Sequence, residues 1–185
     1  MRRMTAALPS ADDVLRFWRD AGPERWFKKS DAFDDEFRSR FLAAHTAAAD
    51  GRLAPWAASA MGALALLLLL DQFPRNAFRG SARMFATDGE ARAVAGAAID
   101  AGFDRAVDDA LRPFFYMPFM HSERLADQQR CVALCQALDD NTQRYARLHR
   151  DIIERFGRFP HRNALLGRES TPEEARFLAE GGFAG

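Results

Sequence analysis

Cysteine, lysine and tyrosine, with two residues each, are the residue types that this sequence has least of. Its two cysteines, Cys131 and Cys135, are too few for a disulfide framework and do not resemble a four-ligand zinc site. Only Lys28 and Lys29 among the 26 positively charged residues are lysines. The others are arginines, whose planar guanidinium groups can bind a carboxylate or phosphate through two parallel hydrogen bonds. The net charge is zero, whereas a nucleic-acid-binding protein normally has a basic excess, so we expect no nucleic-acid partner.

No apolar run is long enough to cross a bilayer. The most apolar stretch covers residues 57–70 and ends at Asp71, short of the roughly 20 residues that a membrane-spanning helix needs. The N-terminus also lacks the apolar segment of a secretory signal peptide. We therefore expect a cytoplasmic protein with no membrane partner.

The sequence lacks strand patterns and the common catalytic motifs. No useful length of chain alternates apolar and polar residues. There is no glycine-rich phosphate loop, dinucleotide fingerprint, Gly-x-Ser-x-Gly elbow or His-Glu-x-x-His pair. His121-Ser122-Glu123 followed by Cys131 departs from the zinc deaminase signature, because the two cysteines are four residues apart and no proline precedes the first. We assign no metal site, and the cofactor, if any, stays unknown.

Patterns typical of helices fill most of the chain. Phe33, Phe37 and Phe41 repeat every four residues, which predicts one buried stripe on a helix over about 31–49. With the other helical patterns, this predicts a single all-α domain over residues 1–185, an antiparallel array of about eight helices. No 34-residue repeat is present, so any likeness to tetratricopeptide proteins would concern architecture alone.

Capping residues mark several expected helix starts. In a capping box, a Ser or Thr side chain and an acidic side chain three residues later satisfy free backbone amides. Ser122 and Asn141 are expected to cap two further helices. The capping boxes are expected at Ser10–Asp13, Thr87–Glu90 and Thr171–Glu174.

Prolines mark the expected interruptions. The leucine-rich stretch predicts a fully buried helix over about 57–72, which Pro74 follows. Residues 112–120 are aromatic but contain Pro113 and Pro118, so we predict an irregular segment there.

Three proline-containing segments share one pattern, in which polar residues follow an apolar residue and a proline. They are residues 71–76 (DQFPRN), 116–123 (YMPFMHSE) and 156–163 (FGRFPHRN). Polar groups on ordered, non-helical chain are well placed for binding or catalysis. If the three segments meet, they would form one polar site.

These segments, with the residues that follow them, resemble the bacterial family known as domain of unknown function 924. The resemblance extends from Phe17-Trp18 and Trp26-Phe27 nearly to the end of the chain. It implies an all-α, tetratricopeptide-like fold and no activity, because the family has no known one. An acidic residue is expected before His121, where this chain has Met120. The supporting residues after the three segments are Arg79-Gly80, Gln128, Leu166-Gly167-Arg168 and Ser170–Glu174.

His121 and Glu123 are candidates for a general acid and base, or, less favoured, for two metal ligands, because they lie two residues apart in or beside a predicted loop. Their structural alternative is a helix start, where a carboxylate suits the helix dipole. His161 could add a second imidazole to the site or bond a helix end. His149 falls on an apolar helix face, so we predict a core histidine with no functional role.

Arg75, Arg158 and Arg162 are candidates for an anion clamp, since guanidinium groups bind carboxylate and phosphate. They could equally form a structural network with Asp71 and backbone carbonyls. The other expected ligand-binding residues are Asp71, Gln72, Asn76, Tyr116, Ser122, Gln128 and Asn163.

Two functions from different classes remain open. The first is a small-molecule site that recognises an anionic group, with or without catalysis. The second is a helical-repeat-like protein-interaction module with no catalytic activity, in which the Arg and His segments are structural. The first requires that the three segments line one concave pocket, and the second predicts an open groove elsewhere.

Overall fold

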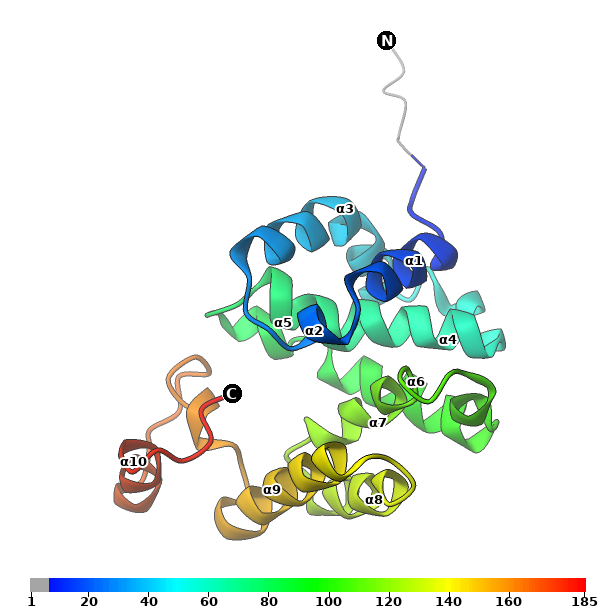
Figure 1. The fold of residues 1–185 in the computed structure, drawn as a ribbon. Helices are drawn as coiled ribbons and strands as arrows, with labels where there is room; N and C mark the ends of the chain where they lie inside the picture. The colour runs from blue at the N-terminus through cyan, green and yellow to red at the C-terminus, as the bar shows by residue number, and fades with distance from the viewer. Residues whose placement is uncertain (1–6) are drawn as a thin grey trace.

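The computed structural model describes residues 7–185, which form ten α-helices and no β-strand (Figure 1). The all-α prediction is therefore confirmed. Eight of the helices have eight or more residues. The helices are α1 (Ala11–Ala21), α2 (Pro23–Trp26), α3 (Asp31–Ala49), α4 (Ala60–Leu67), α5 (Phe73–Ala77), α6 (Asp88–Asp100), α7 (Pro113–Met120), α8 (Leu125–Cys135), α9 (Asp140–Phe156) and α10 (Pro172–Ala179).

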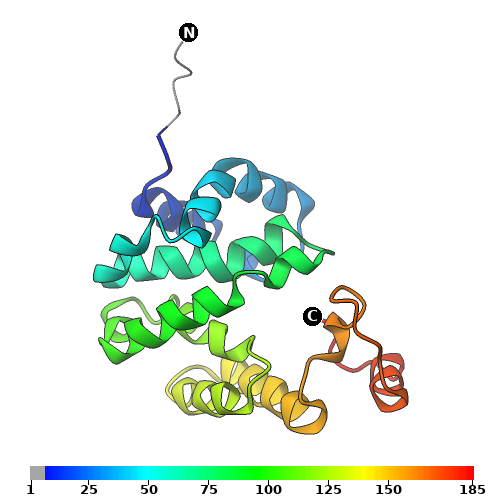
Figure 2. The ribbon, with the colours of Figure 1, turned by 180° about the vertical axis from the view of Figure 1, so that it is seen from behind.

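The leucine-rich helix α4 lies at the centre of the packing. It contacts α1 on one side and α6 on the other, and Figure 2 shows it between these neighbours from behind. Residues 63–70 are at most 3% exposed. The prediction of a fully buried helix over about 57–72 is thus confirmed for residues 62–72, because packing on both sides stabilises a segment that is apolar all round. Residues 57–59 are exposed and precede the helix, which corrects the predicted start. None of the described helices is long and apolar enough to cross a membrane.

The predicted phenylalanine stripe of α3 packs on α1. The rings of Phe33, Phe37 and Phe41 each lie 5.1–5.3 Å from the ring of Phe17, measured between centroids. Offset and tilted contacts of this kind stabilise aromatic clusters beyond the burial of their area. The cluster continues through Trp18 to Phe114 of α7, whose ring centroid lies 5.4 Å from that of Trp18.

Residues 71–76 are helical, so the prediction that Pro74 interrupts the helical structure there is wrong. A π-helical turn, Leu68–Gln72, leads directly from α4 into α5. Pro74 has no amide hydrogen to donate to the carbonyl of Leu70, four residues before it. Thr87 Oγ1 donates to that carbonyl instead, at 2.6 Å. A long-range hydrogen bond thus compensates for the proline.

The same contact overturns the capping box expected at Thr87–Glu90. Helix α6 begins at the expected place, with Asp88, but the Thr87 side chain makes no cap bond. The other two predicted capping boxes, at Ser10–Asp13 and Thr171–Glu174, are confirmed.

Residues 113–120 form helix α7, which corrects the prediction of an irregular segment. Pro113 stands in the first turn, where a missing amide hydrogen costs nothing. Every side chain from Phe114 to Met120 is buried, so burial of aromatic and methionine side chains outweighs the cost of Pro118.

Two cap assignments between α7 and α9 are also wrong. Helix α8 begins at Leu125, after Ser122, whose hydroxyl donates to Asp127 instead. Helix α9 begins at Asp140 and is capped by Asp139, which accepts from the amide of Thr142, whereas Asn141 was expected to cap it.

A second, smaller core lies near the end of the chain. Ile152 and Ile153 of α9 pack with Phe159 there, and Phe177 and Phe183 cover them. The final residues then return toward α5, where Figure 1 shows the C-terminal end between α5 and α9. This return closes one wall of a cavity.

Candidate functional site

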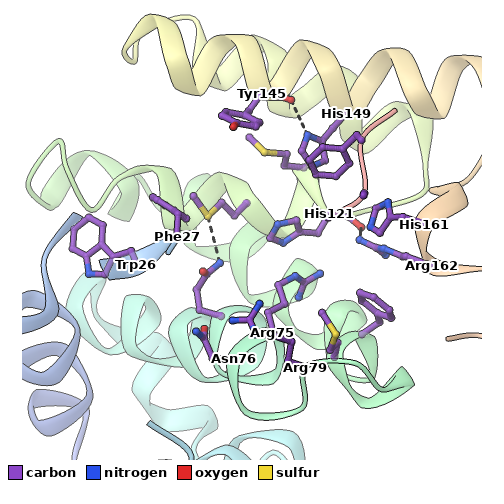
Figure 3. A pocket seen from close by; sticks show the side chains of 18 of the residues that line it. Trp26, Phe27, Arg75, Asn76, Arg79, His121, Tyr145, His149, His161 and Arg162 are labelled. Atoms are coloured by element: carbon purple, nitrogen blue, oxygen red, sulfur yellow. Dashed lines mark hydrogen bonds between the residues drawn. The ribbon is translucent and has the colours of Figure 1, made fainter. Parts of the chain in front are cut away.

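A cavity of about 650 Å³ lies between the N-terminal helices, α9 and the last residues of the chain (Figure 3). Its volume is in the range of small-molecule sites. All three segments singled out in the sequence contribute to its wall. Their lining residues are Gln72, Arg75 and Asn76 from the first, Met117, Met120 and His121 from the second, and His161 and Arg162 from the third.

Asp71 and His121 form a hydrogen-bonded pair at this wall. The Nδ1 atom of His121 lies 2.7 Å from Oδ1 of Asp71, whose side chain is 1% exposed. An ionised carboxylate only accepts hydrogen bonds, so Nδ1 carries the proton and Nε2 keeps its lone pair. Among the described residues, Nε2 has no hydrogen-bond partner. This is the arrangement in which a carboxylate fixes the tautomer of a basic imidazole.

The π-helical turn, Leu68–Gln72, positions Asp71. An extra residue per turn changes the direction of the side chains that follow, and such turns are frequent at functional sites. Burial alone would raise the pKa of Asp71. The neighbouring His121 and Arg75, with hydrogen bonds from His121 and Gln72, instead lower it to about 2. The carboxylate is therefore ionised at neutral pH although it is buried.

Burial, and then the charge of Arg75, lower the pKa of His121 below its ordinary value despite the opposing effect of Asp71. An imidazole with a lowered pKa is neutral at pH 7 and can accept a proton at Nε2. The pair therefore has the charge state of a general base.

Two more histidines line the cavity. Burial and the nearby His121 lower the pKa of His149 to about 4, and burial and Arg162 lower the pKa of His161 to about 4. His149 donates from Nδ1 to the carbonyl of Tyr145 at 2.8 Å. His149 is buried, as the sequence predicts. However, it also lines the cavity, so the prediction of a purely core histidine was incomplete.

Arg162 is held between two aromatic rings. Its guanidinium carbon lies 4.4 Å from the centroid of Phe85 and 4.6 Å from that of Phe159. It donates to the carbonyl of His121 at 2.9 Å, while its buried Nε has no partner among the described residues. Burial, together with the charge of Arg75, lowers its pKa to about 10, which still leaves it fully charged at pH 7.

The other cavity arginines are paired with carboxylates behind the wall. Arg75 binds Asp88 through two hydrogen bonds, of 2.8 and 3.0 Å. Arg79 binds Asp34 in a similar way, and Asp34 also accepts from Asn76. These bonds fix the guanidinium groups in position before any ligand arrives.

Glu123 does not pair with His121, which corrects the acid–base pair expected from their spacing. Its carboxylate accepts two hydrogen bonds from Arg168 and one from the amide of Phe159, at 2.8–2.9 Å. Burial would raise the pKa of Glu123, but the hydrogen bonds and charge of Arg168 lower it. The spacing of two residues between His121 and Glu123 does not determine the direction in which either side chain points. The carboxylate partner of His121 is Asp71, which lies 50 residues away in the sequence.

Arg158 also lies outside the cavity wall. It is bound to Glu174 by two hydrogen bonds and to the carbonyl of Glu169. The three-arginine clamp is therefore reduced to Arg75 and Arg162, with Arg79 beside them.

Four other expected ligand-binding residues make structural contacts away from the cavity lining. The Tyr116 hydroxyl donates to Asp104, and Ser122 donates to Asp127. The Gln128 amide donates to the carbonyls of Met120 and Ser122, which holds the end of α7. Asn163 donates to Ser170 and Glu174 and accepts from Arg168.

Several cavity residues were not chosen from the sequence. Tyr145 and His149 share one face of α9, and their spacing of four residues was the available signal. Others come from elements whose approach no local pattern reveals, among them Trp26, Phe27, Met84, Phe85 and Phe183.

Comparison with known proteins identifies the family. The model of a family described as bacterial proteins of unknown function, DUF924, matches residues 14–182. The chain belongs to the DUF924 family. A solved structure of a protein of unknown function from Agrobacterium tumefaciens is 55% identical, with a TM-score of 0.91. The match covers 92% of this chain and 97% of the other. No curated protein matches.

Met120 stands directly before His121, where the sequence resemblance led us to expect an acidic residue, and it lines the cavity. Within residues 7–185, no group of three or more His, Cys, Asp or Glu side chains is arranged to hold a metal ion. The wall around His121 therefore combines imidazole, guanidinium and thioether groups.

Proposed function

We propose that this DUF924 protein binds a small molecule with an anionic group in the cavity, and that the Asp71–His121 pair exchanges a proton with it. The observation that carries the proposal is the charge of the wall. The described lining residues include no Asp or Glu. Their cationic members are Lys28, Arg75, Arg79 and Arg162.

Fixed cations in a partly dry cavity favour an anion more strongly than the same cations in water, because the local dielectric constant is lower. Arg162 offers the best donor. Arg75 and Arg79 already bind carboxylates, whereas Arg162 approaches Asp88 only at 3.6 Å. An anion bound there would lie near Nε2 of His121, since Arg162 is bonded to the carbonyl of the same residue.

The proton role follows from the charge state of the pair. A proton taken up by Nε2 of His121 converts the ring to imidazolium, which the ionised Asp71 stabilises at 2.7 Å. The sequence-based hypothesis paired His121 with Glu123. In this proposal the carboxylate partner of His121 is Asp71 instead.

The first test is thermal denaturation of the whole protein with acetate, benzoate, inorganic phosphate and phenyl phosphate. A ligand at 100 times its dissociation constant adds about 2.7 kcal/mol of stability, which is roughly 5–11 °C for a chain of this size. We expect at least one anion to raise the melting temperature in this way. Arg162→Gln should abolish the effect, and Arg162→Lys should keep part of it because the charge remains.

Arg147→Ala is the matched control. Arg147 is an exposed arginine of α9 outside the cavity lining, so its removal changes the net charge equally without touching the site. Equal loss in Arg147→Ala and Arg162→Gln would indicate general electrostatic attraction. If no anion shifted the wild-type protein, the protein-interaction module would become the better hypothesis.

A further inference from the structure

The two ends of the cavity differ in chemistry. Figure 3 shows Trp26, Phe27 and Tyr145 on one side and His161 and Arg162 on the other, with His121 between them. The first end is aromatic. Met117, whose sulfur lies 3.4 Å from the amide nitrogen of Gln72, also lines the cavity. The second end, which we call the cationic end, carries Arg162. A ligand that fills the cavity would contact both.

Phe27 is the clearest sign that the aromatic end receives an apolar group. Its side chain is 66% exposed, more than any other large hydrophobic residue among those described. The ring is not loose, because it stacks on Phe114 at 6.1 Å and meets Trp26 edge to face at 6.4 Å. A rigid aromatic ring that faces solvent at a cavity is typical of a binding surface, since covering it removes apolar area from water.

Tyr145 supports the same conclusion from the opposite wall. It is 39% exposed, lines the cavity from α9, and is another of the few large hydrophobic side chains that the described fold leaves exposed. Phe27 and Tyr145 come from segments more than 100 residues apart, yet they face the same space (Figure 3). Flat side chains on two walls suit a flat apolar group.

The cationic end, with Arg162, suits the anionic group of the same ligand. This group would lie on the opposite side of the ligand from the flat apolar group. The Arg162 guanidinium is fixed between Phe85 and Phe159, so little side-chain freedom is lost when it binds. Carboxylate and phosphate both accept the paired hydrogen bonds that a guanidinium donates.

We propose that the cavity binds an amphipathic anion, an aromatic or similarly flat apolar group that carries one carboxylate or phosphate. The apolar group lies against Phe27 and Tyr145, and the anion lies at Arg162 and His121. This inference rests on the proposed function, because it takes anion recognition for granted and adds the second half of the ligand.

The test uses matched probes in calorimetric titrations of the whole protein. 2-Naphthoate carries both features, 2-naphthamide keeps the ring but is neutral, and acetate keeps only the charge. We expect 2-naphthoate to bind at least tenfold more tightly than either partial probe. 2-Naphthyl phosphate then shows which anion is preferred, and tight binding of either naphthyl anion supports the inference.

Two variants of α9 separate the aromatic contact from a general effect on the helix. Tyr145→Ala should weaken 2-naphthoate five- to tenfold and leave the affinity for acetate unchanged. Leu148→Ala is the matched control, because Leu148 is 38% exposed on the same helix but lies outside the cavity lining. Equal affinities of the two variants for 2-naphthoate would overturn the inference.

The remaining outcomes distinguish the two proposals. Acetate binding as tightly as 2-naphthoate would refute the amphipathic ligand and leave anion recognition standing. If 2-naphthamide bound as tightly as 2-naphthoate, anion recognition itself would fail, and the inference with it. Absence of binding by all probes would refute both.

Discussion

His149 and His161 differ from ordinary surface histidines because burial keeps both rings uncharged. Burial, with the nearby positive groups, lowers each pKa to about 4, from an ordinary value of 6.5. Their neutral rings complete a cavity wall in which the permanent positive charges are the arginines and Lys28. A drop in pH would charge these histidines at the expense of stability.

We predict that the protein loses stability as the pH falls from about 6.5 to 4. In that window the unfolded chain binds protons at its histidines while the folded protein does not, so unfolding becomes more favourable. The lowered pKa of His149 makes its contribution about 3 kcal/mol at most, fully present above pH 6.5 and absent below pH 4. Melting temperature measured against pH checks this in wild type and in His149→Asn, which keeps a side-chain donor near Tyr145.

The slope of melting temperature between pH 6.5 and 4 should be clearly smaller in His149→Asn. Asp71 and Glu174, whose pKa values are lowered to about 2 from ordinary values of 3.8 and 4.5, begin to lose their contribution near the lower edge of this window. They do so in both proteins, so the difference between the two slopes reports on His149. Parallel curves for the two proteins would contradict the prediction.

The run from α4 through the π-helical turn into α5 shows how one element prepares the site. The turn points Asp71 at His121, and Pro74 follows three residues later. The Leu70 carbonyl that Pro74 leaves unpaired is satisfied by Thr87, which comes from the start of α6. The hydrogen bond thus ties two elements together beside the cavity.

Thr87→Val should therefore destabilise the protein by about 1–3 kcal/mol. Valine has the shape of threonine but leaves the buried carbonyl of Leu70 without a donor. Melting should fall by roughly 2–12 °C. Thr87→Ser, which keeps the hydroxyl, is the control and should lose less, and an equal loss in both variants would mean that packing of the methyl group matters more.

At the scale of the whole molecule, the Glu123 carboxylate connects the main core to the small core near the end of the chain. It follows α7 in the main core and binds Arg168 and the amide of Phe159, which belongs to the small core. Glu123 thus helps to hold the third segment against the second, as does the hydrogen bond from Arg162 to the carbonyl of His121.

Glu123→Gln should lower stability while anion binding is unchanged. Loss of the charge weakens two hydrogen bonds to Arg168, which we expect to cost about 1–2 kcal/mol because the group is partly exposed. Melting temperature and a calorimetric titration with 2-naphthoate measure the two effects separately. Unchanged melting with lost binding would contradict the structural role assigned to Glu123.

The sequence by itself determined the all-α class, the buried leucine-rich helix, the phenylalanine stripe of α3 and two of three capping boxes. These depend on local periodicity and on side chains within four residues of their partners. It also pointed to Arg75, His121, His161 and Arg162, because polar residues beside prolines are unusual in apolar surroundings.

Only the tertiary structure decided which of those residues share a cavity and which partners they have. Asp71 meets His121 across 50 residues, whereas Glu123 turns to Arg168. Thr87 donates a hydrogen bond to the Leu70 carbonyl, to which Pro74 cannot donate. Burial of their side chains stabilises residues 113–120 as a helix despite Pro118. Hydrogen bonds and packing between distant segments override local preferences because a buried group must find its partner wherever the fold places one.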